Sequence, residues 1–179
     1  MNPDSPLTAL RAGLAADRDA LFAAVDSVPA ALRDRKPAPD RWSVAEVLEH
    51  LGIVETRTVA ALAPLISEAP PVGGASAATP LDRTLLRDRT KRVTAPEMIR
   101  PTGTVSAEAA RAALERSREG LLAVLDTAEG RDLTAVGRNH PRLGQIDGYQ
   151  WIASIGGHEE RHTLQIREIA DQFAAQQRT

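Results

Sequence analysis

The sequence predicts an all-α protein, a four-helix bundle with a long crossover between the second and third helices. Apolar residues recur at steps of three and four along four long segments, which is the helical period. Runs with the period of two that is typical of strands are missing. A stretch rich in proline, glycine and alanine, residues 67–104, separates the second segment from the third. A chain of 179 residues can bury one proper core, so we expect a single domain over residues 1–179.

The first two helices have clear start signals. Ser5 is the expected N-cap of the first helix, and Pro6 is its first residue. Ser43 and Glu46 form a capping box at the start of the second helix, and Trp42 is placed to pack onto its first turn. The sequence therefore predicts where both helices begin.

The connection over residues 67–104 is long enough to let the second and third helices run parallel, whereas a short loop would force them antiparallel. We expect a short helix within it, over residues 81–92. Loops of this length are usually functional or disordered, and this one can fold over a pocket. The third helix is expected to begin near Ser106 and the fourth at Asp147, after a turn over residues 138–145.

Composition excludes several classes of function. The formal net charge is −2 and the 22 basic residues are scattered, so we expect no nucleic-acid surface and no polybasic membrane patch. No stretch approaches the ~20 apolar residues that span a bilayer, and the start lacks a signal-peptide pattern, so we expect a cytoplasmic protein. The chain has no cysteine, which excludes thiolate metal ligands and cysteine nucleophiles. Any thiol chemistry requires a thiol from outside the chain.

Three histidines occupy positions where a bundle buries apolar side chains. His158 and His162 are four residues apart, so they lie one turn apart on the apolar face of the fourth helix. His50 repeats this pattern on the second helix. Several neutral imidazoles in one core are costly to desolvate unless a partner satisfies them, and a divalent metal ion does so. We therefore predict that the three histidines bind one metal ion.

Three protein ligands leave coordination positions for water and substrate, as in catalytic sites. Zinc or nickel is the favoured ion, and iron(II) and manganese also accept imidazole. Two alternatives remain open. The histidines could be core residues that are hydrogen-bonded to neighbours, or the protein could be noncatalytic, either a bundle that the metal staples together or a small-molecule binding module.

The segment HEERH also satisfies the HExxH motif of zinc proteases, in which Glu159 would be the general base. Such a protease needs a third ligand downstream. Glu168 lies six residues past His162, about 600° around a helix, which turns it away from the metal face. We therefore disfavour a protease and expect Glu159 to face a flanking groove or solvent.

Three segments together resemble the DinB-like superfamily of metalloenzymes, over essentially the whole chain: RWSVAEVLEHL, TAPEMIRPTG and HPRLGQIDGYQWIASIGGHEERHTLQIREI. The resemblance implies a four-helix bundle with a long crossover. It also implies a metal triad of one histidine on the second helix and two on the fourth, here His50, His158 and His162.

Better-understood members of that superfamily are metal-dependent transferases of small thiols such as bacillithiol or mycothiol. Others are isomerases that use such a thiol, and many have no assigned activity. The resemblance therefore implies an enzyme that activates a low-molecular-weight thiol, or water, on a divalent metal for transfer or hydrolysis. The expected partners are a small-molecule substrate and a second copy of the chain in a homodimer, with no nucleic acid and no membrane.

Further residues near the triad are candidates for contacts to a ligand or a substrate. Gln165 lies three residues past His162, where it could hold that ligand or a bound water, or pack as an amide at the bundle edge. Arg57 lies seven residues past His50, so it returns to the same seam and could meet a substrate carboxylate or extend to solvent.

Three other residues carry weaker expectations. Asp17 lies on the inward seam of the first helix and could orient an imidazole. Arg161 is expected to point away from the ligands and to pair with a carboxylate. His140 precedes a proline in a turn, so we interpret it as loop structure rather than a fourth ligand.

Overall fold

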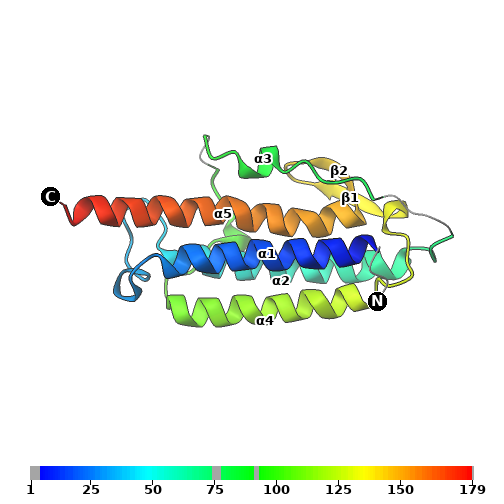
Figure 1. The fold of residues 1–179 in the computed structure, drawn as a ribbon, viewed down its shortest axis with the longest axis horizontal. Coiled ribbons are helices and arrows are strands. Elements are labelled where there is room, and N and C mark those ends of the chain that lie inside the picture. Colours follow the sequence, from blue (N-terminus) through cyan, green and yellow to red (C-terminus); the bar gives the residue numbers. More distant parts are fainter. Residues whose placement is uncertain (1–4, 74–77, 91–92, 179) are drawn as a thin grey trace.

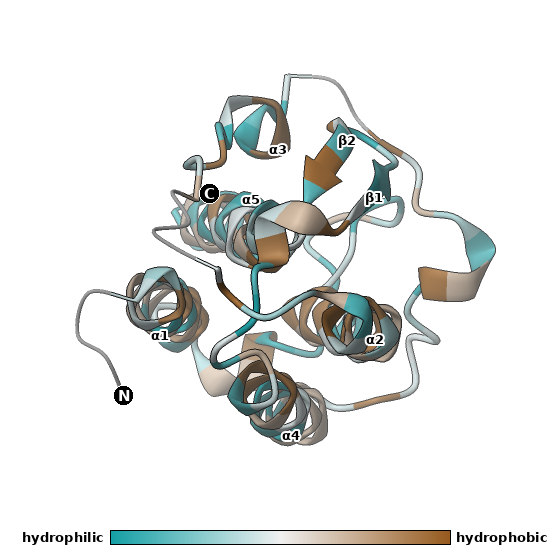
Figure 2. Ribbon diagram, turned by 90° about the vertical axis from the view of Figure 1, so that its right-hand side faces the viewer, coloured by the Kyte–Doolittle hydropathy of each residue, from teal (hydrophilic) through white to brown (hydrophobic). Residues whose placement is uncertain are grey.

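Four long helices form the bundle in the computed structural model, which describes residues 5–73, 78–90 and 93–178. They are α1 (Pro6–Asp26), α2 (Val44–Glu68), α4 (Ala107–Asp126) and α5 (Gly148–Gln176). Helix α1 packs on α5 and α2 packs on α4, while α2 also contacts α5. Viewed nearly end-on, the four helices stand at the corners of a square (Figure 2). The predicted helical bundle is confirmed. No helix in the described part of the chain is both long and apolar enough to span a membrane.

The long crossover allows two helices that follow one another in the bundle to run parallel. In Figure 1, α2 and α4 both run from left to right, whereas α1 and α5 run from right to left. The crossover carries a short helix, α3 (Thr84–Arg87), and a 3-10 turn, η2 (Glu97–Ile99). Helix α3 is shorter than the helix expected over residues 81–92, of which residues 91 and 92 lie outside the described ranges. Asp82 and Asp88 accept hydrogen bonds from backbone N–H groups two residues on, which is turn chemistry that competes with a longer helix.

The predicted helix starts are confirmed. Ser5 caps α1 through its side chain. Ser43 and Glu46 form the reciprocal capping box of α2, and Asp147 and Gln150 form that of α5. These caps satisfy backbone N–H groups that the first turn leaves unpaired, so they determine where each helix begins.

A small antiparallel hairpin precedes α5, where the sequence predicted only a turn. Strand β1 (Gly137–His140) pairs with β2 (Gly144–Asp147). Gly144 has a φ of +73°, a conformation that favours glycine and lets the chain turn back. Each strand has four residues, and only Ile146 is fully buried. Strands this short, with Ile146 as their single apolar side chain, have no alternation that a sequence pattern can reveal.

The core consists of two apolar clusters separated by one charged layer. One cluster includes Leu14, Leu62, Leu121 and Ile155, and the other includes Leu21, Leu51, Leu114 and Ile166. Each bundle helix contributes one charged residue to this layer, which lies between its members of the two clusters: Arg18, Glu55, Arg118 and Glu159. The candidate metal centre lies next to this layer, because His158 directly precedes Glu159.

Candidate metal centre

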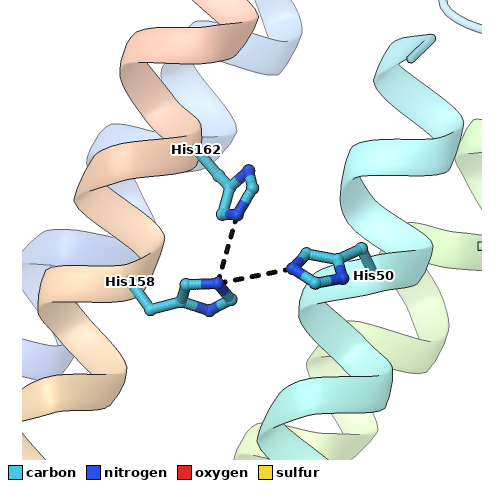
Figure 3. Close-up of side chains that lie close together, drawn as sticks. All are labelled: His50, His158 and His162. Carbon is cyan, nitrogen blue, oxygen red and sulfur yellow. Dashed lines mark hydrogen bonds between the residues drawn. The ribbon is translucent and has the colours of Figure 1, made fainter. Parts of the chain in front are cut away.

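Three imidazoles from two helices converge between α2 and α5 (Figure 3). The Nε2 atom of His158 lies 3.1 Å from Nε2 of His162 and 3.4 Å from Nε2 of His50. One ring nitrogen from each histidine lies within 4.8 Å of the other two. Among the described residues, this is the one group of three or more histidine or carboxylate side chains with such spacing. The tertiary structure therefore brings together the three histidines that the sequence singled out.

The spacing of the nitrogens fits a metal ion. Two nitrogens that each lie 2.0–2.1 Å from an ion are separated by about 3.4 Å at a tetrahedral angle and about 3.0 Å at a right angle. The two Nε2 separations, 3.1 and 3.4 Å, lie in this range. The donor set therefore fits a divalent cation that accepts imidazole.

Hydrogen bonds at Nδ1 orient two of the rings. Nδ1 of His50 donates to the backbone carbonyl of Ile99 at 2.7 Å. Nδ1 of His162 donates to Oε1 of Gln165 at 2.9 Å. A proton on Nδ1 leaves the lone pair of Nε2 free to face an ion, which is the usual arrangement at protein metal sites. Gln165 thus makes the contact to a candidate ligand, His162, that its spacing suggested.

The crossover supports both of these rings. Ile99 belongs to η2, so the carbonyl that holds His50 comes from the crossover. Arg89, also in the crossover, donates to Oε1 of Gln165 at 3.4 Å and forms a two-pronged pair with Glu168 at 2.7 and 2.8 Å. The same oxygen of Gln165 accepts from His162, so the geometry of the site depends on the docking of the crossover.

Burial keeps the three histidines neutral. Desolvation lowers the pKa of His158 to about 3, and the positive charge of Arg161 opposes its protonation as well. Desolvation also lowers the pKa of His162 well below its ordinary value, and it lowers the pKa of His50 against the opposing effect of the Ile99 carbonyl. Neutral imidazole is the form that binds a metal ion, so the site is in the competent protonation state at neutral pH.

A cavity of about 910 Å³ adjoins the three imidazoles. Its walls come from α2, α5, the hairpin and the described parts of the crossover. Both tryptophans of the chain line it, together with apolar side chains such as Leu51, Val54 and Ile155. A small molecule in this cavity can therefore reach the side of the centre that the histidines leave open.

Trp42 contributes more to the site than the sequence suggested. The expected role was a contact with the first turn of α2. In the structure its ring centroid lies 5.0 Å from that of His50 and 6.4 Å from that of His162, nearly parallel to the latter ring. The available signal was the position of Trp42 just before the capping box, because that position places it at the end of α2 that carries His50.

Asp17 does not make the contact suggested for it, and Arg57 takes the second of the two courses suggested for it. The carboxylate of Asp17 pairs with Arg83 of the crossover at 2.8 Å instead of orienting an imidazole. Gly156 makes this possible, because a Cβ there would overlap the Asp17 carboxylate. Arg57 is exposed and donates to the sulfur of Met98, so it extends to solvent instead of entering the cavity. A long side chain at an inward position can still extend to solvent, because water stabilises its charged end.

Arg161 differs from the expectation in direction and in partner. It lines the cavity instead of pointing away, and its Nη1 donates to the backbone carbonyls of Leu86 and Asp88 instead of to a carboxylate. His140, at the end of β1, accepts hydrogen bonds from the backbone of the hairpin turn and is not a member of the three-histidine group. The ring of His140 nevertheless packs against Trp151 at the cavity wall.

The expectation for Glu159 was also wrong. Its side chain is buried, and its Oε1 accepts a hydrogen bond from Nε of Arg18 at 2.7 Å. Its Oε2 is buried without a hydrogen-bond partner, and burial raises the pKa of the carboxyl group while Arg118 and Arg18 oppose that rise. The signal that could have revealed this site was the presence of Arg18 and Arg118 on inward seams, at the same helical spacing that singled out the histidines.

Comparisons with known proteins identify the family of this chain. The family model described as DinB superfamily matches residues 14–166, which include all three histidines. This chain belongs to the DinB superfamily. It is 29% identical over 141 residues to the uncharacterized protein YuaE of Bacillus subtilis (strain 168), a match that covers 78% of this chain and 84% of YuaE. No solved structure matches the chain significantly.

The match to the DinB superfamily spans parts of all four bundle helices. It begins inside α1 and ends inside α5, so it contains the whole of α2, the crossover and α4. YuaE has no assigned activity in its name, so the similarity establishes a family and not a reaction. Any functional assignment therefore rests on the geometry of the three-histidine group and its cavity.

Proposed function

We propose that this DinB superfamily protein is a divalent-metal-dependent enzyme that activates a low-molecular-weight thiol, or water, for transfer or hydrolysis on a small-molecule substrate. The observation that carries the proposal is the open side of the three-histidine group. Three donors converge from α2 and α5, and a cavity of about 910 Å³ adjoins them. Three protein ligands with free positions are typical of catalytic sites, whereas a structural site is closed by four.

The chain's own residues have distinct roles in this proposal. His50, His158 and His162 hold the ion, with zinc or nickel favoured. The bound ion supplies Lewis acidity, which lowers the pKa of a thiol or water in the cavity. Ile99 and Gln165 keep the Nδ1 protons of two ligands in place. The chain has no cysteine, so the thiol is a cosubstrate.

A protease of the HExxH type is not supported. A general base must lie within hydrogen-bond reach of the water it deprotonates. Although Glu159 lines the cavity, its Oε1 accepts a hydrogen bond from Arg18 and its Oε2 is buried. Neither oxygen is therefore placed to act on a water molecule in the cavity.

The first test is the metal content of protein purified without a histidine tag. We expect about one divalent ion per chain, and each of His50→Ala, His158→Ala and His162→Ala should release most of it because each removes one of three ligands. His140→Ala is the matched control and should keep the ion. Stoichiometric metal in the His158→Ala, His162→Ala double variant would refute the site.

The second test is turnover with a panel of small thiols and electrophiles, with and without a chelator. We expect thiol consumption to need the metal. Transfer at full rate after chelation would refute the thiol reaction. A protein that retains its ion, gains stability from it and turns over neither thiols nor hydrolysable substrates would instead be a noncatalytic, metal-stapled bundle.

A further inference from the structure

The charged side chains that line the cavity are mostly arginines. There are five of them: Arg41, Arg89, Arg100, Arg142 and Arg161. Of the four carboxylates that line it, Glu168 is paired with Arg89, while Glu55 and Glu159 are paired with arginines of the charged layer in the bundle core. The fourth, Asp40, directly precedes Arg41. The cavity therefore has an excess of positive charge before any metal ion is added.

Two of the arginines are held by neutral acceptors. Arg161 donates to the carbonyls of Leu86 and Asp88, and Arg142 donates to the carbonyl of Leu85. All three carbonyls belong to α3 or to the residue that follows it, so both guanidinium groups are anchored on the same short segment. A carbonyl accepts a hydrogen bond without carrying a net charge, so these contacts position the two cations and do not neutralise them.

Arg161 keeps donors for a ligand. Its contacts to the α3 segment use Nη1, and its Nε and Nη2 atoms donate to no described group. Arg161 as a whole is buried, and it lines the cavity. Since no described group occupies these two nitrogens, they are available to a molecule that enters the cavity.

Both arginines lie at the same cavity as the candidate metal centre. Arg161 directly precedes His162 in the chain, and Arg142, Arg161 and the three histidines all line the cavity. An anion that enters a cavity with two positive charges on its wall is attracted to both.

We propose that Arg161 and Arg142 bind an oxyanion group, a carboxylate or a phosphate, on the small molecule whose other end reaches the three histidines. A guanidinium presents a planar set of donors that matches either oxyanion. The contact between the small molecule and the three histidines rests on the proposed function. The inference narrows the substrate class to small acids. The thiol or its electrophile carries an anionic group a few bonds from the reacting atom.

Tryptophan fluorescence can measure this binding without turnover. The chain has two tryptophans, Trp42 and Trp151, and both line the cavity. The first probe pair is 3-mercaptopropionate and its neutral amide, 3-mercaptopropionamide, titrated into metal-loaded protein. The second pair, propionate and propionamide, lacks the thiol and is titrated with and without metal. Methyl phosphate is the phosphate probe.

We expect the acid of each pair to bind about tenfold more tightly than its amide, as a charge-assisted hydrogen bond predicts. Arg161→Gln and Arg142→Gln should each remove most of this preference. Either substitution can also loosen α3, but loosening weakens acid and amide alike, so the ratio of the two affinities is the readout. Arg167→Gln is the matched control, because Arg167 lies on the same helix as Arg161 and is exposed, away from the cavity.

Tighter binding of propionate than of methyl phosphate would assign the group as a carboxylate, and the reverse order would assign it as a phosphate. An unchanged ratio in both arginine variants would overturn the inference, since any preference would then come from the metal alone. If the chain binds no metal, the proposed function fails, but the propionate pair still tests the arginines. If the ratio is unchanged in both arginine variants but the protein retains its metal ion, the proposed function still stands.

Discussion

The Nε atom of Arg18 in α1 donates a 2.7 Å hydrogen bond to Oε1 of Glu159 in α5, the residue next to His158 of the candidate metal centre. Two more buried charges complete a closed ring. Arg18 also pairs with Glu55, Glu55 pairs with Arg118, and Nη2 of Arg118 lies 3.0 Å from Oε1 of Glu159. Each bundle helix contributes one member, and the two positive charges balance the two negative ones. The ring therefore fixes the rotation of α5, and with it the direction of His158 and His162.

We predict that Glu159→Gln lowers the free energy of unfolding by about 3 kcal/mol, because it leaves two buried arginines with a single carboxylate. Urea denaturation measures the effect. Asp126→Asn is the matched control, since Asp126 pairs with Arg11 at the surface, and its loss should change stability by less than about 1 kcal/mol. Equal effects of the two substitutions would show that the ring contributes nothing beyond a surface pair.

The same variant distinguishes the ring from a protease base. Glu159→Gln should keep the metal ion, because Glu159 is not a ligand, and the wild-type protein should leave casein uncut. Cleavage of casein by the wild type that is lost in Glu159→Gln would make the protease interpretation correct.

Gln165→Leu should weaken metal binding by about 10- to 100-fold, because it removes the acceptor that holds the Nδ1 proton of His162. Competition with a chelator of known affinity measures the change. Gln172→Leu, two turns further along α5 and outside the cavity, should bind metal as the wild type does. Equal affinity in both variants would mean that Gln165 only packs at the bundle edge.

Acid should destabilise the metal-free protein. The pKa of each of the three histidines is lowered in the folded state, so below about pH 6.5 the unfolded chain binds more protons than the folded one. Their contribution is therefore fully present above that pH and is lost as the pH falls, by up to about 1.4 kcal/mol per pH unit for each histidine. Denaturation of chelated protein at pH 7.5 and pH 5 tests this. A His158→Gln variant should have a shallower pH dependence, and an equally steep one would contradict the assignment.

Gly156→Ala should destabilise the protein by about 1–3 kcal/mol, although alanine favours a helix over glycine by about 1 kcal/mol. The added Cβ would overlap the carboxylate of Asp17 and lie 2.9 Å from Nη2 of Arg83, so it must disrupt the pair that anchors the start of α3. Gly120→Ala in α4 is the control, because a Cβ there meets nothing within 4 Å, and it should stabilise the protein. Changes of the same sign in the two variants would argue against close packing of α3 on α5.

Local signals in the sequence were sufficient for the bundle and for the choice of the three histidines that lie together. The capping residues Ser43 and Asp147 predicted the starts of α2 and α5 because a cap is completed within one turn. His158 and His162 were predicted to share a face because that depends only on the helical period. The hairpin before α5 was missed, since its strands are too short to show a period.

Contacts between distant residues were decided by the tertiary structure. Arg18 and Glu159 are 141 positions apart, and Asp17 and Arg83 are 66 apart, so no spacing rule relates them. The helical period places a residue on a wide face, but the side chain within that face turns toward whichever partner another helix or the crossover presents. For this reason the sequence by itself determined which histidines could meet, whereas only the packed bundle decided that Glu159 joins the buried ring, that Arg57 extends to solvent and that Arg161 enters the cavity.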